Sequence, residues 1–527
     1  MTALPTPPSA TPARTVRPAR TKIVSVEDLP GIAARAKAEG KTVVMAHGVF
    51  DLLHLGHVRH LEAARREGSV LIVTLTADAF VNKGPGRPAF PEHLRAEMLG
   101  ALEYVDWVAV NHQPSAEGLL RSVAPNVYVK GVEYADAGAD VTGKITPERA
   151  AVESGGGRIV FTDDVTFSSS TLINKYLNVY DPSLQRYLDE MRARGALDDL
   201  LAAVEAVRGL RVLFVGDAIV DEYNYVSPLG KSPKENMIAT LFQEQERFAG
   251  GVFAAANHTA GLCAQVDVIT CLGAADGHEA LVRDYLRPNV GLTALWRDNV
   301  PTTRKARFID SYAMRKLFEV YHMDDSPMPE HLDATLCGIL SERAGDYDLV
   351  VVTDFGHGLL SRAARRVLQD RARFLAVNTQ TNSANTGFNL ISKYARADFV
   401  CLDSNEARLA TSDKFADMAD IAGRTLPAVI DCPRLIVTQG KHGCVGFNAD
   451  EAGGPCRVPA LTSTIVDTVG AGDAFFAVTA PMMAAGVPMP LVGFLGNAAG
   501  ALKVGIVGHR TSVEKAPLVK FITALLK

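Results

Sequence analysis

The chain has 527 residues, of which 47% are hydrophobic and 21% are charged. At roughly 100–200 residues per domain this length indicates several domains, and a composition close to the globular average excludes general disorder and fibrous repeats. The 54 basic and 59 acidic residues leave a formal net charge of −5, which argues against a nucleic acid or an anionic membrane as the main partner. We therefore expect any phosphate binding to be local.

The first 21 residues are predicted to form a disordered tail. Residues 1–20 contain five prolines and three arginines and lack the apolar run of a secretory leader. The seven cysteines of the chain form no C-x-x-C pair. We therefore expect reduced thiols in a cytoplasmic protein, and neither a disulfide framework nor a zinc site.

Residues 22–180 alternate between short apolar runs and stretches of helical periodicity. Strands separated by helix-length segments are typical of right-handed βαβ units, so this region is predicted to be an α/β domain with a parallel sheet. The expected strands are Thr42–Ala46, Val70–Leu75, Trp107–Val110, Val127–Val129 and Arg158–Phe161, with helices around His57–Arg66, Glu92–Glu103, Ala116–Val123 and Pro147–Glu153.

A charged helical stretch, residues 181–210, begins at an Asp-Pro pair that would stop a preceding helix. We expect this stretch to be a linker helix. From residue 211 to residue 527 the alternation of strands and helices resumes, which predicts a second α/β domain.

A first candidate site follows the strand Thr42–Ala46, where the chain continues to His54 and His57 at the start of a helix. Ligands of open α/β sheets bind at the carboxyl ends of strands, and a helix N-terminus offers free N–H groups to phosphate. Gly56 between the histidines lets the backbone approach a polyphosphate closely. Both imidazoles can then donate hydrogen bonds to the charge that develops on an attacked phosphate. Zinc is a weaker alternative, because no third ligand is evident nearby and the spacing is not i, i+4.

The segment Gly48-x-Phe50-Asp51-x-x-His54-x-Gly56-His57 resembles the signature of the cytidylyltransferase-like nucleotidyltransferases, and the resemblance covers roughly residues 40–178. It implies a Rossmann-like parallel sheet, catalysis by His54 and His57, and ATP or CTP as the nucleotidyl donor; the sequence does not decide between the two bases. The residues implied in nucleotide or phosphate binding are Gly48, Phe50, Asp51, Gly56, Lys83, Lys130, Ser169, Ser170 and Thr171.

A second candidate site lies at Gly470-Ala471-Gly472-Asp473, just before a long uncharged stretch, Ala474–Leu502. Three small residues entering a helix expose consecutive N–H groups, which can form an anion hole for a transferring phosphoryl group. Asp473 is placed to take a proton from an attacking hydroxyl. Prolines and glycines break the uncharged stretch into pieces too short to span a membrane, so we expect buried helices there.

This segment resembles the signature of the PfkB/ribokinase family of carbohydrate kinases, and the resemblance spans about residues 211–527. It implies a ribokinase-like α/β sandwich, ATP as the phosphoryl donor and Mg²⁺. The resemblance places sugar contacts at Asp217, Asp221, Gly250 and Gly251, the adenine side at Asn497, and magnesium, bound directly or indirectly, at Glu406 with Asp403.

Three departures from the family pattern concern the substrate pocket. Ala254 stands where relatives have a sugar-binding asparagine. The N-x-x-E motif appears as Asp403-Ser-Asn-Glu406, and Asn378-Thr-Gln380-Thr-Asn382 replaces the frequent Asp-Pro-Lys. The identity of the sugar is therefore what these changes put in question.

A kinase and a nucleotidyltransferase on one chain indicate two consecutive steps toward a nucleotide-activated sugar. The pairing resembles the bifunctional heptose 7-phosphate kinase/heptose 1-phosphate adenylyltransferase family, which makes ADP-heptose, but with the order of the two domains reversed. The expected partners are sugar phosphates and nucleoside triphosphates, without nucleic acid or membrane, and a homodimer is implied by the resemblance to sugar kinases.

Three alternatives remain open from the sequence. In the first, the chain is a cytidylyltransferase for a sugar or an alditol phosphate such as glycerol or ribitol phosphate. In the second, the kinase domain is divergent and only binds a substrate, as Ala254 and Asp403 suggest. In the third, both sites are vestigial and the chain is a scaffold.

Overall fold

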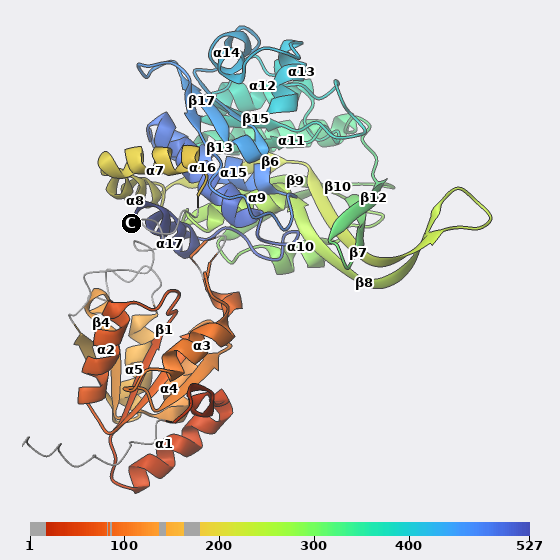
Figure 1. Cartoon of the computed structure of the whole chain (residues 1–527). Helices are drawn as coiled ribbons and strands as arrows, with labels where there is room; N and C mark the ends of the chain where they lie inside the picture. Colours follow the sequence, from red (N-terminus) through yellow and green to blue (C-terminus); the bar gives the residue numbers. More distant parts are fainter. Residues whose placement is uncertain (1–16, 82, 85–86, 136–143, 163–179) are drawn as a thin grey trace, which may run out of the picture. The chain divides into compact units, whose positions relative to one another are not determined.

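The computed structural model describes residues 17–81, 83–84, 87–135, 144–162 and 180–527. The chain divides into two compact units, Met1–Val179 and Tyr180–Lys527 (Figure 1). Both units are α/β, as the sequence predicts, and each is described by itself below.

The N-terminal unit contains a parallel sheet of five strands in the order β3-β2-β1-β4-β5. Successive side chains of β1 point to opposite faces of the sheet. Val43 and Met45 pack with α1, α4 and α5, whereas Val44 and Ala46 pack with α2 and α3. The strands are β1 Val43–Gly48, β2 Val70–Thr76, β3 Trp107–Asn111, β4 Val127–Gly131 and β5 Arg158–Thr162; the helices are α1 Leu29–Ala38, α2 Leu55–Arg66, α3 Glu92–Gly100, α4 Glu117–Val123 and α5 Ile145–Ser154.

The disordered tail was predicted to reach residue 21, which is too far, because residues 19–22 have regular structure. Ala19–Lys22 forms a turn of 3-10 helix. The Lys22 side chain is buried, and its Nζ donates to the Leu102 carbonyl at 2.8 Å. The ordered unit therefore begins before residue 22, because this turn packs on α3.

The C-terminal unit contains two sheets. The larger has nine strands in the order β10-β9-β6-β13-β14-β15-β16-β17-β18, and it is parallel except for β17 and β18. The smaller has the order β12-β11-β7-β8, and its long β7–β8 hairpin projects from the unit (Figure 1). The strands are β6 Arg211–Gly216, β7 Ala218–Lys231, β8 Ile238–Gly251, β9 Gln265–Gly273, β10 Val290–Arg297, β11 Thr303–Asp310, β12 Arg315–His322, β13 Leu349–Asp354, β14 Leu375–Thr379, β15 Phe399–Asp403, β16 Arg434–Thr438, β17 Cys444–Asn448 and β18 Cys456–Val458.

Helices cover both faces of the nine-stranded sheet. Val212 and Phe214 of β6 face the core shared with α7, α8, α9, α10, α15, α16 and α17. Leu213 and Val215 face the core under α11, α12, α13 and α14. The helices are α7 Pro182–Ala193, α8 Ala196–Ala206, α9 Val252–Ala260, α10 Glu279–Tyr285, α11 Glu330–Arg343, α12 Arg362–Arg371, α13 Ser404–Thr411, α14 Met418–Asp420, α15 Ala471–Ala484, α16 Met489–Lys503 and α17 Lys515–Leu526.

The uncharged stretch that follows Asp473 forms most of α15 and α16, and most residues of these helices are buried, as the sequence predicts. Within the residues described here, we find no helix with the length and apolar character needed to cross a membrane.

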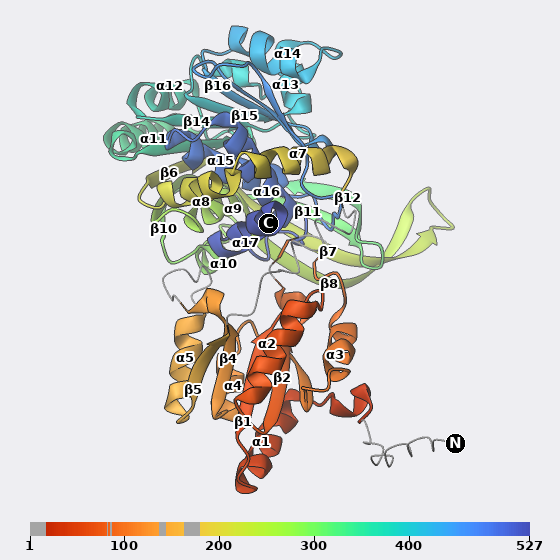
Figure 2. The ribbon, with the colours of Figure 1, turned by 60° about the vertical axis from the view of Figure 1, so that its left-hand side comes forward.

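The segment 181–210, predicted to be a linker helix, is instead part of the C-terminal core. It forms α7 and α8, separated at Gly195, whose positive φ of 67° suits glycine. Leu184, Leu188 and Leu200 are buried in that core, and both helices contact α17 (Figure 2). The predicted helical periodicity is confirmed. The apolar face of α7 and α8 is covered by α17, which lies more than 300 residues later in the chain.

We expect Leu188→Ala to lower the free energy of unfolding of the C-terminal unit by about 2–5 kcal/mol, because it leaves a cavity at a fully buried position. The chain has two tryptophans, Trp107 and Trp296. In a Trp107→Phe background, urea unfolding followed by the fluorescence of Trp296 on β10 reports on this unit alone. The exposed neighbour Arg186→Ala is the control; equal stability of the two variants would contradict burial of α7.

Candidate active sites

The N-terminal candidate site is built at the start of α2. His54 is the N-cap of this helix, and its Nδ1 accepts the Gly56 amide at 3.1 Å. The rings of His54 and His57 lie 4.0 Å apart between centroids. The Phe50 ring packs on His57 at 5.2 Å. The structure therefore brings the two signature histidines together beside free helix N–H groups.

Both histidines are held in the neutral form. Burial, with His54 and Lys83, lowers the pKa of His57 to about 3. Burial and Lys83 also lower the pKa of His54. Because His54 Nδ1 accepts a hydrogen bond, its proton lies on Nε2, which can donate to a phosphate oxygen.

Asp51, predicted to bind nucleotide or phosphate, uses its carboxylate inside the protein. It is fully buried, and its oxygens accept hydrogen bonds from Arg87 Nη1 at 2.9 Å and from the Ala89 amide. Arg95, also buried, donates to the carbonyls of Val49 and Phe90. These two arginines hold the loop of residues 48–57, which carries the signature motif. The sequence pattern did not assign them this role, because Asp51 lies 36 positions from Arg87 and Val49 lies 46 positions from Arg95.

The predicted phosphate-binding lysines differ in their surroundings. Lys83 is half-buried, and its charge acts on both histidines. Lys130, at the end of β4, pairs with the buried Glu148 at 3.0 Å, with the Tyr134 ring 5.0 Å from its Nζ. Any anion that binds Lys130 must therefore compete with Glu148.

Two further parts of the predicted site remain. Gly48 ends β1, where an added Cβ would lie 3.2 Å from the Phe50 ring, so a side chain there would press on the signature loop. Ser169, Ser170 and Thr171 lie outside the described residues.

The C-terminal candidate site is a cavity of about 490 Å³, a size suited to a nucleotide. Gly470 is the N-cap of α15 with a φ of 74°, a left-handed conformation that favours glycine. The cavity brings together most of the residues predicted for phosphoryl transfer: Gly470, Ala471, Gly472, Asp473, Asn497, Asp403 and Glu406, with Gln380 in addition.

Asp473, in the first turn of α15, is the predicted base. Burial raises the pKa of its carboxyl, while the His509 charge and a hydrogen bond from Gln380 Nε2 lower it. Gln380 is one of the departures noted in the sequence, and its contact with a residue 93 positions away was not predicted. The raised pKa makes Asp473 a better proton acceptor than a solvated aspartate.

Asp403 and Glu406 form a capping box at the start of α13. Asp403 Oδ1 accepts the Glu406 amide at 2.8 Å, and Glu406 Oε2 accepts the Asp403 amide at 2.8 Å. Glu406 Oε1 accepts the Thr381 amide at 2.9 Å, and burial with the Asp403 charge raises the pKa of Glu406 to about 8. No group of three potential metal ligands occurs among the described residues. These carboxylates can therefore hold Mg²⁺ only together with nucleotide phosphates and water, which is a usual arrangement for this ion.

The predicted sugar residue Asp217 is buried at the end of β6. Its Oδ2 accepts the amides of Phe355 at 2.9 Å and His357 at 3.3 Å. Burial and the neighbouring Asp354 raise the pKa of Asp217 to about 6. Gly251 is required beside it, since its φ is 54° and an added Cβ would lie 2.8 Å from the Asp217 carbonyl oxygen.

Asp221, the second predicted sugar aspartate, is anchored by an arginine and a histidine. Its Oδ1 accepts from Arg307, and His509 Nε2 lies 3.2 Å from its Oδ2. Although burial raises the pKa of Asp221, Arg307 and His509 hold it well below the usual range. An added Cβ on Gly250 would lie 2.1 Å from the Asp221 carboxylate, which explains the glycine.

Lys305 is a residue of this site to which the sequence analysis assigned no role. It is 6% exposed, and the rings of Tyr321 and Phe355 lie 5.3 and 5.6 Å from its Nζ. Burial lowers its pKa, against the charges of Asp221 and Asp473. It thus places a desolvated cation close to the predicted base and the predicted sugar site.

Asp467 joins the four-stranded sheet to the loop that precedes α15. Its Oδ2 accepts the Tyr223 hydroxyl at 2.6 Å and the Gly508 amide at 2.9 Å. Its Oδ1 accepts Lys316 Nζ at 2.6 Å and the Val469 amide at 3.1 Å. Tyr223 lies on β7 and Lys316 on β12. One carboxylate therefore connects two strands of the four-stranded sheet to the loop that precedes α15.

These features define a phosphotransferase site at the N-terminus of a helix in a ribokinase-like fold. Residues 210–516 match the pfkB family of carbohydrate kinases. Because this match covers more than half of the chain, the protein belongs to that family. Residues 45–175 match the cytidylyltransferase-like family, which agrees with the predicted resemblance of the N-terminal unit.

Individual proteins are also similar to this chain. The bifunctional protein HldE of Trichlorobacter lovleyi is 39% identical over 176 residues, which are 33% of this chain and 33% of that protein. HldE of Streptomyces coelicolor is 46% identical over 149 residues, 28% of this chain and 31% of that protein. The chain thus spans about a third of the length of these curated relatives. Phosphofructokinase-2 from Escherichia coli, in complex with substrates and products, has a TM-score of 0.50 at 15% identity and covers 60% of this chain and 100% of that structure, which shows the fold.

We expect Gln380→Leu to move the acidic limb of the kinase kcat/KM profile to higher pH. A carboxylate base must be ionised, and its activity is lost as the pH falls through its pKa; removing the Gln380 hydrogen bond raises that pKa further. Steady-state rates of ADP release between pH 4 and 8 measure the limb, with the surface variant Gln185→Leu as the control. An unchanged or lower limb would show that Asp473 is not the titrating base.

Proposed function

We propose that the chain is a bifunctional enzyme of nucleotide-activated sugar biosynthesis. The C-terminal unit phosphorylates a sugar or sugar phosphate, and the N-terminal unit joins a nucleotide to a sugar 1-phosphate. The observation that carries this proposal is that one chain holds two phosphate-handling constellations, His54 with His57 at α2 and Gly470–Asp473 at α15. The similarity to proteins named HldE supports an ADP-heptose-like product.

In the kinase step, a sugar hydroxyl oxygen attacks the γ-phosphorus of ATP. The new O–P bond forms as the bond from this phosphorus to the bridging oxygen breaks, and ADP leaves. The hydroxyl proton passes to Asp473, and the amides at the start of α15 donate to the oxygens of the transferring group. Mg²⁺, when bound through the phosphates beside Asp403 and Glu406, supplies neutralisation of phosphate charge.

In the nucleotidyl step, a phosphate oxygen of the sugar 1-phosphate attacks the α-phosphorus of ATP or CTP. A new P–O–P linkage forms, and pyrophosphate leaves with the electrons of the broken bond. His54 and His57 donate N–H groups to the α-phosphate oxygens, while Lys83 and Lys130 compensate the charge of the phosphates. The resemblance to HldE favours ATP as the donor.

A second candidate function follows from Ala254. This residue lies buried on α9, where the family pattern has a sugar-binding asparagine, so the pocket lacks one polar contact. In this alternative, the N-terminal unit is a cytidylyltransferase for a sugar or alditol phosphate, and the kinase unit only binds a substrate. CTP consumption without ATP turnover would favour this alternative.

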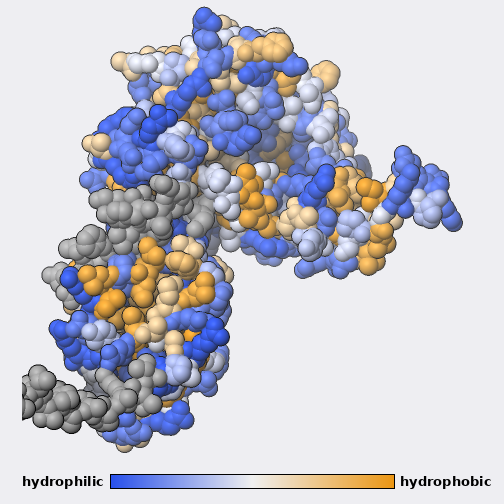
Figure 3. Space-filling model, in the orientation of Figure 1, coloured by the Kyte–Doolittle hydropathy of each residue, from blue (hydrophilic) through white to orange (hydrophobic). Residues whose placement is uncertain are grey.

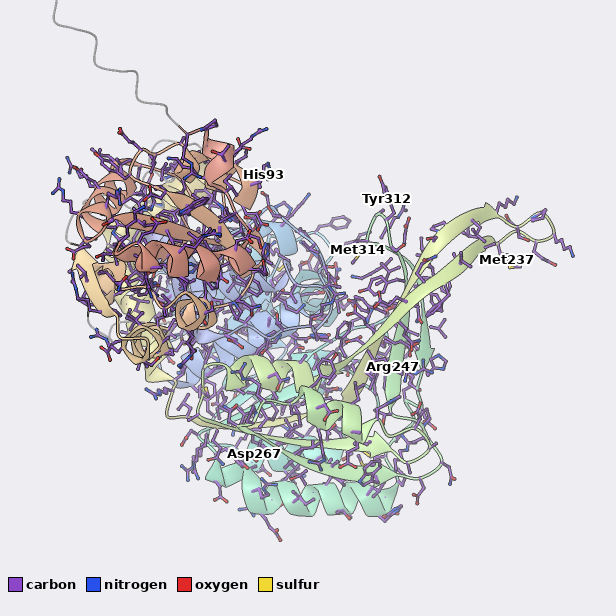
Figure 4. All side chains as sticks on the ribbon, turned by 90° about the horizontal axis from the view of Figure 1, so that it is seen from below. His93, Met237, Arg247, Asp267, Tyr312 and Met314 are labelled. Carbon is purple, nitrogen blue, oxygen red and sulfur yellow. The ribbon has the colours of Figure 1, made fainter. Side chains whose placement is uncertain are left out.

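Two variants separate the two activities. We expect Asp473→Asn to lower ADP formation by about 10²–10⁴-fold while pyrophosphate release is kept, and His57→Asn to do the reverse, because each removes a group from one site only. Both are assayed with ATP or CTP over a panel of heptose, hexose and alditol phosphates. The exposed residues Asp284 and His93 provide the controls Asp284→Asn and His93→Asn; His93 is labelled in Figure 4. If a variant keeps the activity assigned to its site, that assignment is wrong.

We propose further that two copies of the chain pair through the four-stranded sheet. Phe242 and Met237 of the hairpin region are exposed. Met237 is labelled in Figure 4, and Figure 3 shows apolar residues along this part of the molecule. Such exposed apolar groups mark protein interfaces more often than free surface. The large apolar residues exposed in this sheet region are Leu229, Met237, Ile238, Leu241, Phe242, Phe318 and Val320.

Light scattering after size exclusion tests the pairing. We expect the wild type to have the mass of a dimer and Phe242→Asp that of a monomer, because a charge in an apolar interface is desolvated without a partner. Phe415, which is 88% exposed outside this sheet, provides the control Phe415→Asp. A monomeric wild type, or a dimeric Phe242→Asp, would contradict the proposed interface.

A further inference from the structure

Lys503 is a fully buried cation at the end of α16. Its Nζ donates two hydrogen bonds of 2.7 Å, one to the Val469 carbonyl and one to the Gly508 carbonyl. The described residues place no carboxylate within ion-pair distance of it. In the interior, the hydrogen-bond partners of this amino group are therefore two backbone carbonyls.

Such a position is costly, because burial removes the hydration of a full charge. Burial lowers the pKa of Lys503 to about 8, against the more distant charges of Asp467, Asp473 and Asp221. A methionine or leucine would fill the same space between apolar helices without this cost. The reason for a lysine at this position therefore lies in the two segments whose carbonyls it binds.

The two carbonyls belong to the loops on either side of the phosphate site. Val469 immediately precedes Gly470, the N-cap of α15. Gly508 immediately precedes His509, whose ring pairs with Asp221 and lies so close to Gly470 that an added Cβ there would be 2.4 Å from it. Lys503 thus ties the loop that carries the amides to the loop that carries His509.

The geometry of the peptide bond gives this contact a direct effect on the site. The Val469 carbonyl and the Gly470 N–H belong to one planar trans peptide, so they point in opposite directions. A strong hydrogen bond that fixes the carbonyl therefore also aims the N–H. The charge-assisted bond from an ammonium is stronger than a neutral one, and it does not rotate away as a water molecule could.

We propose that Lys503 is a positioning residue for phosphoryl transfer, which aims the Gly470 N–H at the start of α15 by holding the Val469 carbonyl. It touches neither the sugar nor ATP. This inference rests on the proposed kinase activity and assigns a role to a residue outside the recognised signature.

Two substitutions separate this role from mere packing. We expect Lys503→Met, which keeps the length but loses the charge, to lower kcat by about 100-fold, the cost of one misplaced oxyanion donor, with KM for the sugar changed less than about 3-fold. Lys503→Ala opens a space between two carbonyl oxygens. A small cation should enter it, so we expect ammonium, methylammonium or potassium ions to restore activity saturably, and tetramethylammonium not to do so.

The control is Lys515→Met, which removes a partly exposed lysine on α17 paired with Glu205 at 2.5 Å and should leave kcat unchanged. Trp296 fluorescence verifies that each variant is folded. A folded Lys503→Met with wild-type kcat would overturn the inference, as would a folded Lys503→Ala that no small cation restores.

A binding measurement separates failure of this inference from failure of the proposed function. Calorimetry compares ADP alone with ADP plus aluminium fluoride, which imitates a transferring phosphoryl group and needs no known sugar. We expect Lys503→Met to lose at least about 10-fold in affinity for the fluoride complex and little for ADP alone. If the wild type binds this complex but phosphorylates no sugar in the panel, the proposed function fails, and the affinity difference between wild type and Lys503→Met still tests whether Lys503 positions the Gly470 N–H. Equal affinities of wild type and variant would refute the inference.

Discussion

Both sites depend on one constraint of helical backbone, which is that the first N–H groups of a helix have no partner within it. In the N-terminal unit these groups belong to α2, beside His54 and His57. In the C-terminal unit they belong to α15, behind the turn at Gly470. Such groups carry partial positive charge without a basic side chain. This is compatible with a formal net charge of −5 in a chain for which two polyphosphate sites are proposed.

The buried charges near these helices mainly hold loops in place. Asp51 is satisfied by Arg87, Asp217 by two backbone amides, and Asp221 by Arg307 and His509. Each pairing fixes a segment whose backbone would otherwise be free to move. A ligand that binds one of these carboxylates must therefore share it with the partners that already hold it.

The parts of the sites that lie within one helical turn were predictable from the sequence. His54 with His57, and Gly470 with Asp473, are close in space because they are close in the chain. The contacts of Gln380 with Asp473 and of Lys503 with Val469 join residues 93 and 34 positions apart, so no local pattern reveals them. The same limit explains the helices at 181–210, whose periodicity predicted an apolar face but not the distant α17 that covers it.

Asp467 accepts hydrogen bonds from Tyr223 of β7 and Lys316 of β12 and, at the same time, from the amides of Val469 and Gly508. Strands β7 and β12 of the four-stranded sheet are therefore linked to the loop that precedes α15. A motion that opens the unit to admit a sugar cannot separate them without breaking a charged bond. A motion of the hairpin that keeps these bonds is therefore confined to the strand residues beyond Tyr223 and Lys316.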